Sequence, residues 1–195
     1  MAPDCIDSFC NCGKAGKDLQ IHIDQVHPDF FCEGSRCSEH SPGPVSDEET
    51  LAFILINPLH YDEKNGVVVP EAFQELTNRD LSTIRICCAS VKELDATKSQ
   101  LIAIGQAKIP QQLREVDEVC LAKVSKIRSE THNGRRIFGV YDTALVDNKA
   151  HSSIFTRQIY LDDRVLRKIV RSRIHGIFAK ERVKFSDCRK LLGSR

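Results

Sequence analysis

The sequence predicts an α+β protein that carries a small Cys/His-rich segment at its N-terminus. Five of the nine cysteines lie within the first 37 residues. Beyond residue 46, short apolar runs typical of strands alternate with stretches of helical periodicity. An Asn-Gly pair between two such runs indicates a β-hairpin. We therefore expect a Cys/His-rich segment and linker over residues 1–45 and an α+β domain over residues 46–195, because the stretch 38–46 is rich in Ser, Pro and Gly.

The first half of the domain contains two predicted strands and two predicted helices. The apolar runs 51–56 and 82–88 each predict a buried strand. Pro70 suits the first turn of a helix over 70–76. A longer helix is expected over 91–105, where apolar residues recur and the final glycine can end the helix.

The second half begins with the predicted hairpin. The runs 119–128 and 136–142 flank a connection that contains Asn133 and Gly134. These two residue types readily adopt the positive φ angles of a tight hairpin turn.

The chain ends in a predicted amphipathic helix that begins near Leu161. Asp162 and Asp163 lie at the end where the helix dipole is positive. Apolar residues follow at helical spacing. The residues expected to face the body of the protein are Val165, Ile169, Val170 and Ile174.

The net charge of +1 conceals a basic C-terminal region. Residues 162–195 contain eleven Lys and Arg but only four Asp and Glu. Such a basic region on an acidic body predicts contact with an acidic partner, either nucleic acid or protein, or with the body itself. The candidate partner-binding residues are Arg164, Lys168, Arg171, Arg173, Lys180 and Arg182.

The apolar runs are too short for a membrane span, because the longest of them, 51–56, falls far below the ~20 residues required. The first twelve residues lack the basic and apolar pattern of a secretory signal, so we expect a cytoplasmic or otherwise intracellular protein. This location and the odd cysteine count argue against a disulfide framework. Cys87, Cys88 and Cys120 lie in apolar runs, where we expect small buried hydrophobic residues.

The N-terminal segment contains eight candidate zinc ligands. Zinc prefers four thiolate or imidazole ligands, and so short a segment needs a metal to become ordered. One arrangement uses Cys5, Cys10, His22 and His27. Cys32, Cys37 and His40, with Cys12 as a candidate fourth ligand, offer either a second site or the true partners of one rearranged site. The candidates are Cys5, Cys10, Cys12, His22, His27, Cys32, Cys37 and His40.

Residues 5–28 resemble the two-Cys/two-His zinc-finger family. The resemblance is carried by Cys10, by Leu19-Gln-Ile-His22, and by Ile23-Asp-Gln-Val-His27 followed by Pro28. It implies a structural zinc site. The helix has two acids and few cations where family members that read DNA place basic side chains, so we expect the segment to contact protein or to cap the larger domain.

We expect a zinc-stabilised protein that interacts with another macromolecule. The alternative is a hydrolase-type enzyme that uses His60, Asp142 and His151, because each follows a predicted strand or lies in a nearby loop. A histidine there could serve as general base, and the aspartate could hold its tautomer. The sequence leaves open whether the protein is an enzyme.

Overall fold

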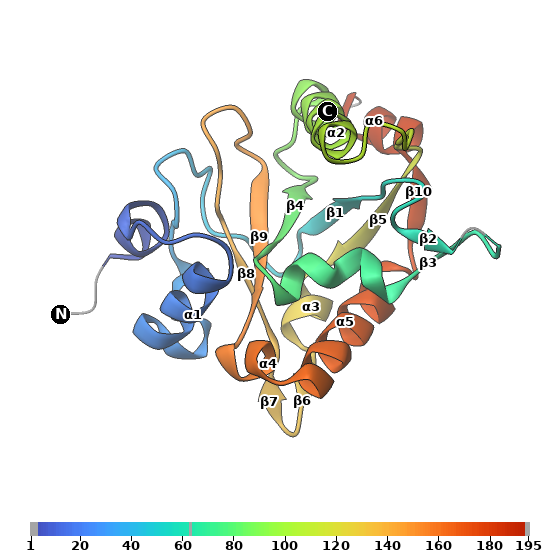
Figure 1. Cartoon of the computed structure of the whole chain (residues 1–195). Coiled ribbons are helices and arrows are strands. Elements are labelled where there is room, and N and C mark those ends of the chain that lie inside the picture. The colour runs from blue at the N-terminus through green and yellow to red at the C-terminus, as the bar shows by residue number, and fades with distance from the viewer. Residues whose placement is uncertain (1–3, 63, 194–195) are drawn as a thin grey trace.

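The computed structural model describes residues 4–62 and 64–193 and has a six-stranded antiparallel sheet at its centre (Figure 1). The strands lie in the order β10-β5-β1-β4-β9-β8, and every neighbouring pair is antiparallel. Their bounds are Thr50–Ile54 (β1), Leu81–Arg85 (β4), Glu118–Lys123 (β5), Phe138–Tyr141 (β8), His151–Thr156 (β9) and Arg182–Lys184 (β10).

Helices cover both faces of the sheet, which confirms the predicted α+β class (Figure 1). One face packs against the 3-10 helix η3 (Pro70–Thr77), α3 (Val124–Arg128) and α5 (Arg164–Phe178). The other face packs against α2 (Val91–Lys108) and α6 (Phe185–Gly193). The remaining elements are η1 (Asp7–Asn11), α1 (Gly16–Val26), η2 (Pro28–Gly34), α4 (Gln158–Asp162), and the short hairpins of β2 (Tyr61–Asp62) with β3 (Val67–Val68) and β6 (Thr131–His132) with β7 (Arg135–Arg136).

Strand β1 explains why the sheet needs two helical layers. Leu51 and Phe53 point into the core beneath α5, while Ala52 and Ile54 point into the core beneath α2. Because successive side chains of a strand alternate between faces, a continuously apolar strand must be covered on both sides.

Several predicted boundaries were wrong. The strand expected over 82–88 is Leu81–Arg85, and Cys87 beyond it is exposed rather than buried. Gly105 does not end α2, which continues to Lys108. The run 119–128 divides into strand β5 and helix α3, because the chain leaves the sheet after Lys123.

The predicted turn at Asn133 and Gly134 is confirmed, but the flanking runs 119–128 and 136–142 do not pair with each other, because β5 lies between β10 and β1 and β8 pairs with β9. Asn133 and Gly134 connect β6 to β7 with φ angles of 52° and 73°. Both angles are positive, as a two-residue type I′ turn requires.

Helix α5 begins at a capping aspartate and buries a narrower stripe than predicted. The Asp163 carboxylate accepts hydrogen bonds from the backbone N–H groups of Val165 and Leu166, which satisfies two of the free donors at the start of the helix. Val170, Ile174 and Phe178 are buried along one stripe of the helix. The prediction for Val165 was wrong, since it is 65% exposed, and Ile169 is only half-buried on the flank.

The N-terminal segment covers β8, the strand at one edge of the sheet (Figure 1). Phe9 and Phe30 pack with Tyr141 and Phe155 of the sheet in a third apolar cluster. The Glu33 carboxylate accepts a hydrogen bond of 2.6 Å from the Val140 backbone N–H. An open strand edge has unpaired N–H groups, so this segment protects it from pairing with other chains.

Glu33 also joins two arginines of the domain to the segment. Its carboxylate forms ion pairs with Arg128 at 3.0 Å and with Arg136 at 2.5 Å. Arg136 lies over the Phe30 ring, 4.7 Å from its centre. The segment is therefore attached to the sheet by both apolar and charged contacts.

Within the described residues, none of the helices combines the length and the apolar character that crossing a membrane requires.

The packing of Phe30 over β8 depends on Gly139. A methyl group at that position would overlap the Phe30 ring and lie 2.9 Å from the Tyr141 ring. We expect Gly139→Ala to lower the free energy of unfolding by about 1–3 kcal/mol. Gly176→Ala in α5 is the matched control, because a methyl group there meets no atom within 4 Å and should stabilise the helix by up to ~1 kcal/mol. Chemical denaturation measures both, and an equal effect of the two substitutions would contradict this account.

Candidate functional site

Three buried residues of the N-terminal segment form a candidate metal site. One possible ligand atom from each of Cys5, His27 and Cys32 lies within 4.8 Å of the other two. Thiolate and imidazole groups are typical ligands of transition metals. The predicted Cys/His cluster is thus confirmed at the level of a group that can hold a metal ion.

Local backbone geometry brings these residues together. Cys5 lies just before η1, and His27 ends α1 with φ of −130° and ψ of 67°. Pro28 follows, and Asp29 and Phe30 have φ angles of 55° and 62°. This left-handed turn reverses the chain and brings Cys32 back toward His27.

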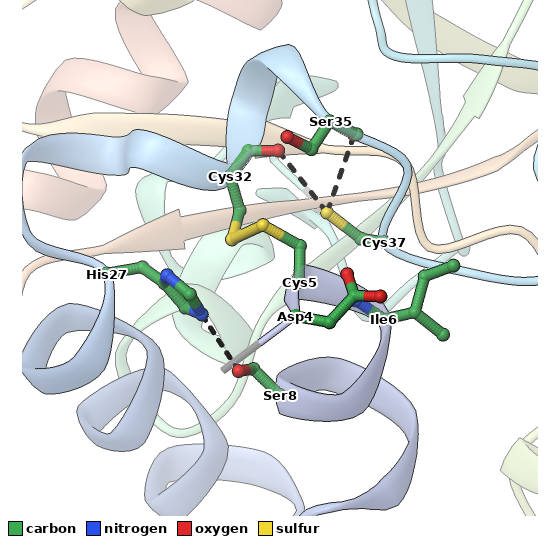
Figure 2. The surroundings of a disulfide bond; sticks show 8 residues. All are labelled: Asp4, Cys5, Ile6, Ser8, His27, Cys32, Ser35 and Cys37. Carbon is green, nitrogen blue, oxygen red and sulfur yellow. Dashed lines mark hydrogen bonds between the residues drawn. A yellow bond between two sulfur atoms is a disulfide. The ribbon is translucent and has the colours of Figure 1, made fainter. Parts of the chain in front are cut away.

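Cys5 and Cys32 form a disulfide in the structure, with their Cα atoms 5.8 Å apart (Figure 2). This bond was not expected from the sequence. A metal binds the thiolate form of cysteine, so the cluster can take a metal only when this disulfide is reduced. The disulfide and a bound metal would therefore exclude each other at these three residues.

The His27 ring fits the metal-binding state. Its Nε2 makes a hydrogen bond of 2.8 Å with the Ser8 hydroxyl, while its Nδ1 is buried without a partner in the described part of the chain (Figure 2). A buried polar atom without a partner costs free energy, and a metal ion would satisfy it. A hydrogen bond to the other ring nitrogen is the usual way of orienting a ligating histidine.

Cys37 is a further cysteine that lies beside this group. Its buried thiol donates to the Cys32 carbonyl at 3.4 Å, and Figure 2 shows it beside the disulfide. Burial, and to a lesser extent the Asp142 carboxylate, raise the pKa of Cys37, so it is a neutral thiol in this environment.

The other four candidate ligands lie outside the group of three. Cys10 donates to the Cys37 carbonyl at 3.4 Å, and Cys12 is half-buried. His22 is also half-buried, whereas His40 is exposed. In a helix with 3.6 residues per turn, positions 22 and 27 point about 140° apart. This explains why Cys32, rather than His22, joins Cys5 and His27.

The three candidate catalytic residues do not share one hydrogen-bond network among the described contacts. His60 and His151 line the same cavity, between the sheet and α2. The His60 Nδ1 accepts from the Ile56 N–H, and the His151 Nδ1 lies 3.0 Å from the Thr143 hydroxyl. Asp142 is not among the residues that line this cavity.

Asp142 belongs to a buried charge cluster instead. Arg85 pairs with Glu49 at 2.7 Å and with Asp142 at 3.4 Å. Arg85 also donates to the carbonyls of Gly43 and Pro44, which fixes the linker against the sheet. Burial raises the pKa of Asp142 to about 6, although Arg85 acts in the opposite direction.

The six candidate partner-binding side chains of the C-terminal region fall into two groups. Arg173 pairs with Glu130 at 3.1 Å, and Arg182 pairs with Glu118 at 3.6 Å, so these two contact the body of the protein. The other four, for which the described residues supply no ion pair or side-chain hydrogen bond, are Arg164, Lys168, Arg171 and Lys180.

Comparison of the chain with protein-family models, with curated proteins and with solved structures finds no match.

Sequence reasoning missed three residues that organise these sites. Ser8 orients His27, Glu33 anchors the N-terminal segment, and Arg114 lies against the cavity that contains both histidines. Each acts on a residue far away along the chain. No local pattern around any of the three signals its role.

The pH dependence of stability tests the environment of His60. Burial, followed by the nearby Arg114 charge, lowers the pKa of His60 to about 4, against about 6.5 in an unfolded chain. The neutral ring therefore contributes stability above pH 6.5 that is lost as the pH falls toward 4. We expect the free energy of unfolding to fall by about 2 kcal/mol more between pH 7 and pH 5 in the native protein than in His60→Asn. Asparagine keeps an acceptor for the Ile56 N–H. Asp142, whose pKa of about 6 lies in the same pH range, is present in both proteins, so its contribution cancels in the comparison. Identical pH profiles would contradict this environment.

Proposed function

We propose that this chain is a zinc-stabilised interaction protein that binds nucleic acid through the outer face of α5. The observation that carries the proposal is the row of cations Arg164, Lys168 and Arg171 on that helix, none of which has an ion-pair partner in the described part of the chain. Zinc in this proposal has a structural role, because it orders the N-terminal segment that covers the sheet edge.

Zinc is supported by the chemistry of the donor set. Cys5, His27 and Cys32 supply two thiolates and one imidazole after reduction, and Cys37 is the candidate fourth ligand. Four protein ligands would leave no open position for a substrate, which is the arrangement of structural zinc sites. Bound zinc would hold both ends of the N-terminal segment together.

Nucleic acid is supported by the spacing of the free cations. Positions 164, 168 and 171 are four and three residues apart, so their side chains project from one face on successive turns. Phosphate backbones are bound chiefly by such basic side chains, and this binding requires no deep complementary pocket. Val165 is exposed beside them and leaves this face open to a partner.

The hydrolase alternative has weaker support. Two of its three residues line one cavity, but the third has Arg85 as its charged partner. A general base is normally oriented by a group within hydrogen-bond reach, and Asp142 forms no such bond with His60 or His151 in the described contacts.

Metal analysis tests the zinc part of the proposal. Protein purified under reducing conditions without chelator should contain about one zinc ion per chain. Cys5→Ser and His27→Ala should lose most of that zinc, whereas Cys88→Ser, a matched change in a half-buried cysteine outside the cluster, should retain it. Zinc-free native protein, or full retention by the first two variants, would refute the assignment.

Salt-dependent binding tests the nucleic-acid part. Labelled duplex DNA or RNA should bind more weakly as salt rises, because each neutralised phosphate releases counterions. Replacing Arg164, Lys168 and Arg171 with Gln should weaken binding for all sequences. It should also reduce the log–log salt slope by about one unit for each phosphate that is no longer neutralised.

The matched control replaces three exposed lysines elsewhere, Lys14, Lys92 and Lys149, with Gln. It removes the same charge and should retain the salt slope if the α5 face is the contact. An equal reduction of the slope in both triple variants would show nonspecific attraction. The absence of any DNA or RNA binding at low salt would end the nucleic-acid proposal and favour a protein partner.

A further inference from the structure

A cavity of about 480 Å³ lies between β1, β4, η3 and α2. Cavities of this volume commonly hold small molecules. Ala52 and Ile54 of β1 and Leu101 of α2 give it an apolar wall. His60 and His151 add polar groups to the same wall.

Arg114 is the unusual group in this cavity. It forms no ion pair or hydrogen bond within the part of the chain that the structure describes, and its Nε atom is buried without a partner. The adjacent residue Glu115 pairs with Asn57 through two backbone hydrogen bonds, which holds Arg114 near the cavity. A buried guanidinium nitrogen without an acceptor is costly, so an anionic acceptor within reach of the Arg114 guanidinium would be favourable.

Gly105 makes room for this arginine. A methyl group at that position of α2 would overlap the Arg114 side chain, which packs directly against the glycine. This contact gives a reason for a glycine inside α2, where alanine would favour the helix by up to ~1 kcal/mol.

His60 presents a fixed donor to the cavity that Arg114 also lines. Its Nδ1 accepts from the Ile56 N–H at 3.1 Å, and its ring stacks on Phe53 with a centroid distance of 5.5 Å. Since Nδ1 is the acceptor, the proton of the neutral ring resides on Nε2, which is free to donate.

The other charges around the cavity leave Arg114 uncompensated. Arg79 is already paired with Glu75 on η3. Lys108 and Glu71 are both exposed at the margin, where water screens their charges. The cavity therefore combines one half-buried positive charge, which has no ion-pair partner among the described residues, with an apolar wall.

We propose that this cavity binds a small amphipathic carboxylate. The carboxylate pairs with Arg114 and accepts from His60, and its apolar chain lies against β1 and Leu101. A single guanidinium balances the one charge of a carboxylate, whereas a phosphate carries more charge and needs further donors.

Calorimetric titration with octanoate tests this site in the full chain. Octanoate should bind the native protein, and octanol, which has the same chain length without the charge, should bind at least tenfold more weakly. Arg114→Gln should weaken octanoate binding at least tenfold. Arg135→Gln, which removes an equal charge from an exposed residue that does not line the cavity, should leave it unchanged within twofold.

A second variant distinguishes the site from a general effect on folding. Gly105→Ala keeps every charge but displaces the Arg114 side chain, so it should also weaken octanoate binding severalfold. Thermal unfolding shows whether each variant is folded. If either Arg114→Gln or Gly105→Ala does not fold, octanoate binding by the other variant tests the site. The proposal is overturned if native protein does not bind octanoate, if octanol binds equally well, if inorganic phosphate binds more tightly than octanoate, or if the folded variants bind octanoate within twofold of native protein.

Discussion

The contact between the N-terminal segment and strand β8 is the constraint that ties the metal-binding group to the sheet. Glu33 binds the exposed edge of β8 through the Val140 N–H and two arginines, and Phe30 packs across Gly139. The Cys5–His27–Cys32 cluster holds the two ends of the same segment together. In the proposed function, a metal bound by this group would therefore stabilise an edge of the sheet rather than contact a substrate.

Local chemistry allowed much of the fold to be predicted. Asn133 and Gly134 have the conformational freedom that a type I′ turn needs, and they form one. Asp163 carries a short acceptor next to free backbone donors, so it caps α5 near the expected start. The alternation of strands and helices was enough for the α+β class. The burial of Val165 was mispredicted because helical periodicity locates an apolar stripe on the helix but does not show which other elements pack against that stripe.

The candidate sites could be predicted only in part, because their contacts span long stretches of sequence. The cysteine and histidine candidates for metal ligands lie together in the sequence before position 41. The pairing of Cys5 with Cys32, however, depends on the left-handed turn at Asp29 and Phe30. Nothing near Arg114 indicates that Gly105 accommodates it. Asp142 follows a strand as a catalytic residue often does, but a distant arginine, Arg85, is its partner.

Hydrogen exchange of the reduced protein tests the coupling between metal and sheet edge most directly. With zinc bound, the Val140 amide, which donates to Glu33, should be protected from exchange. Removal of zinc by a chelator should release the segment and reduce that protection at least tenfold, while the Leu55 amide, which donates to the Glu118 carbonyl in the centre of the sheet, should stay protected. Equal protection of Val140 with and without zinc would contradict the account.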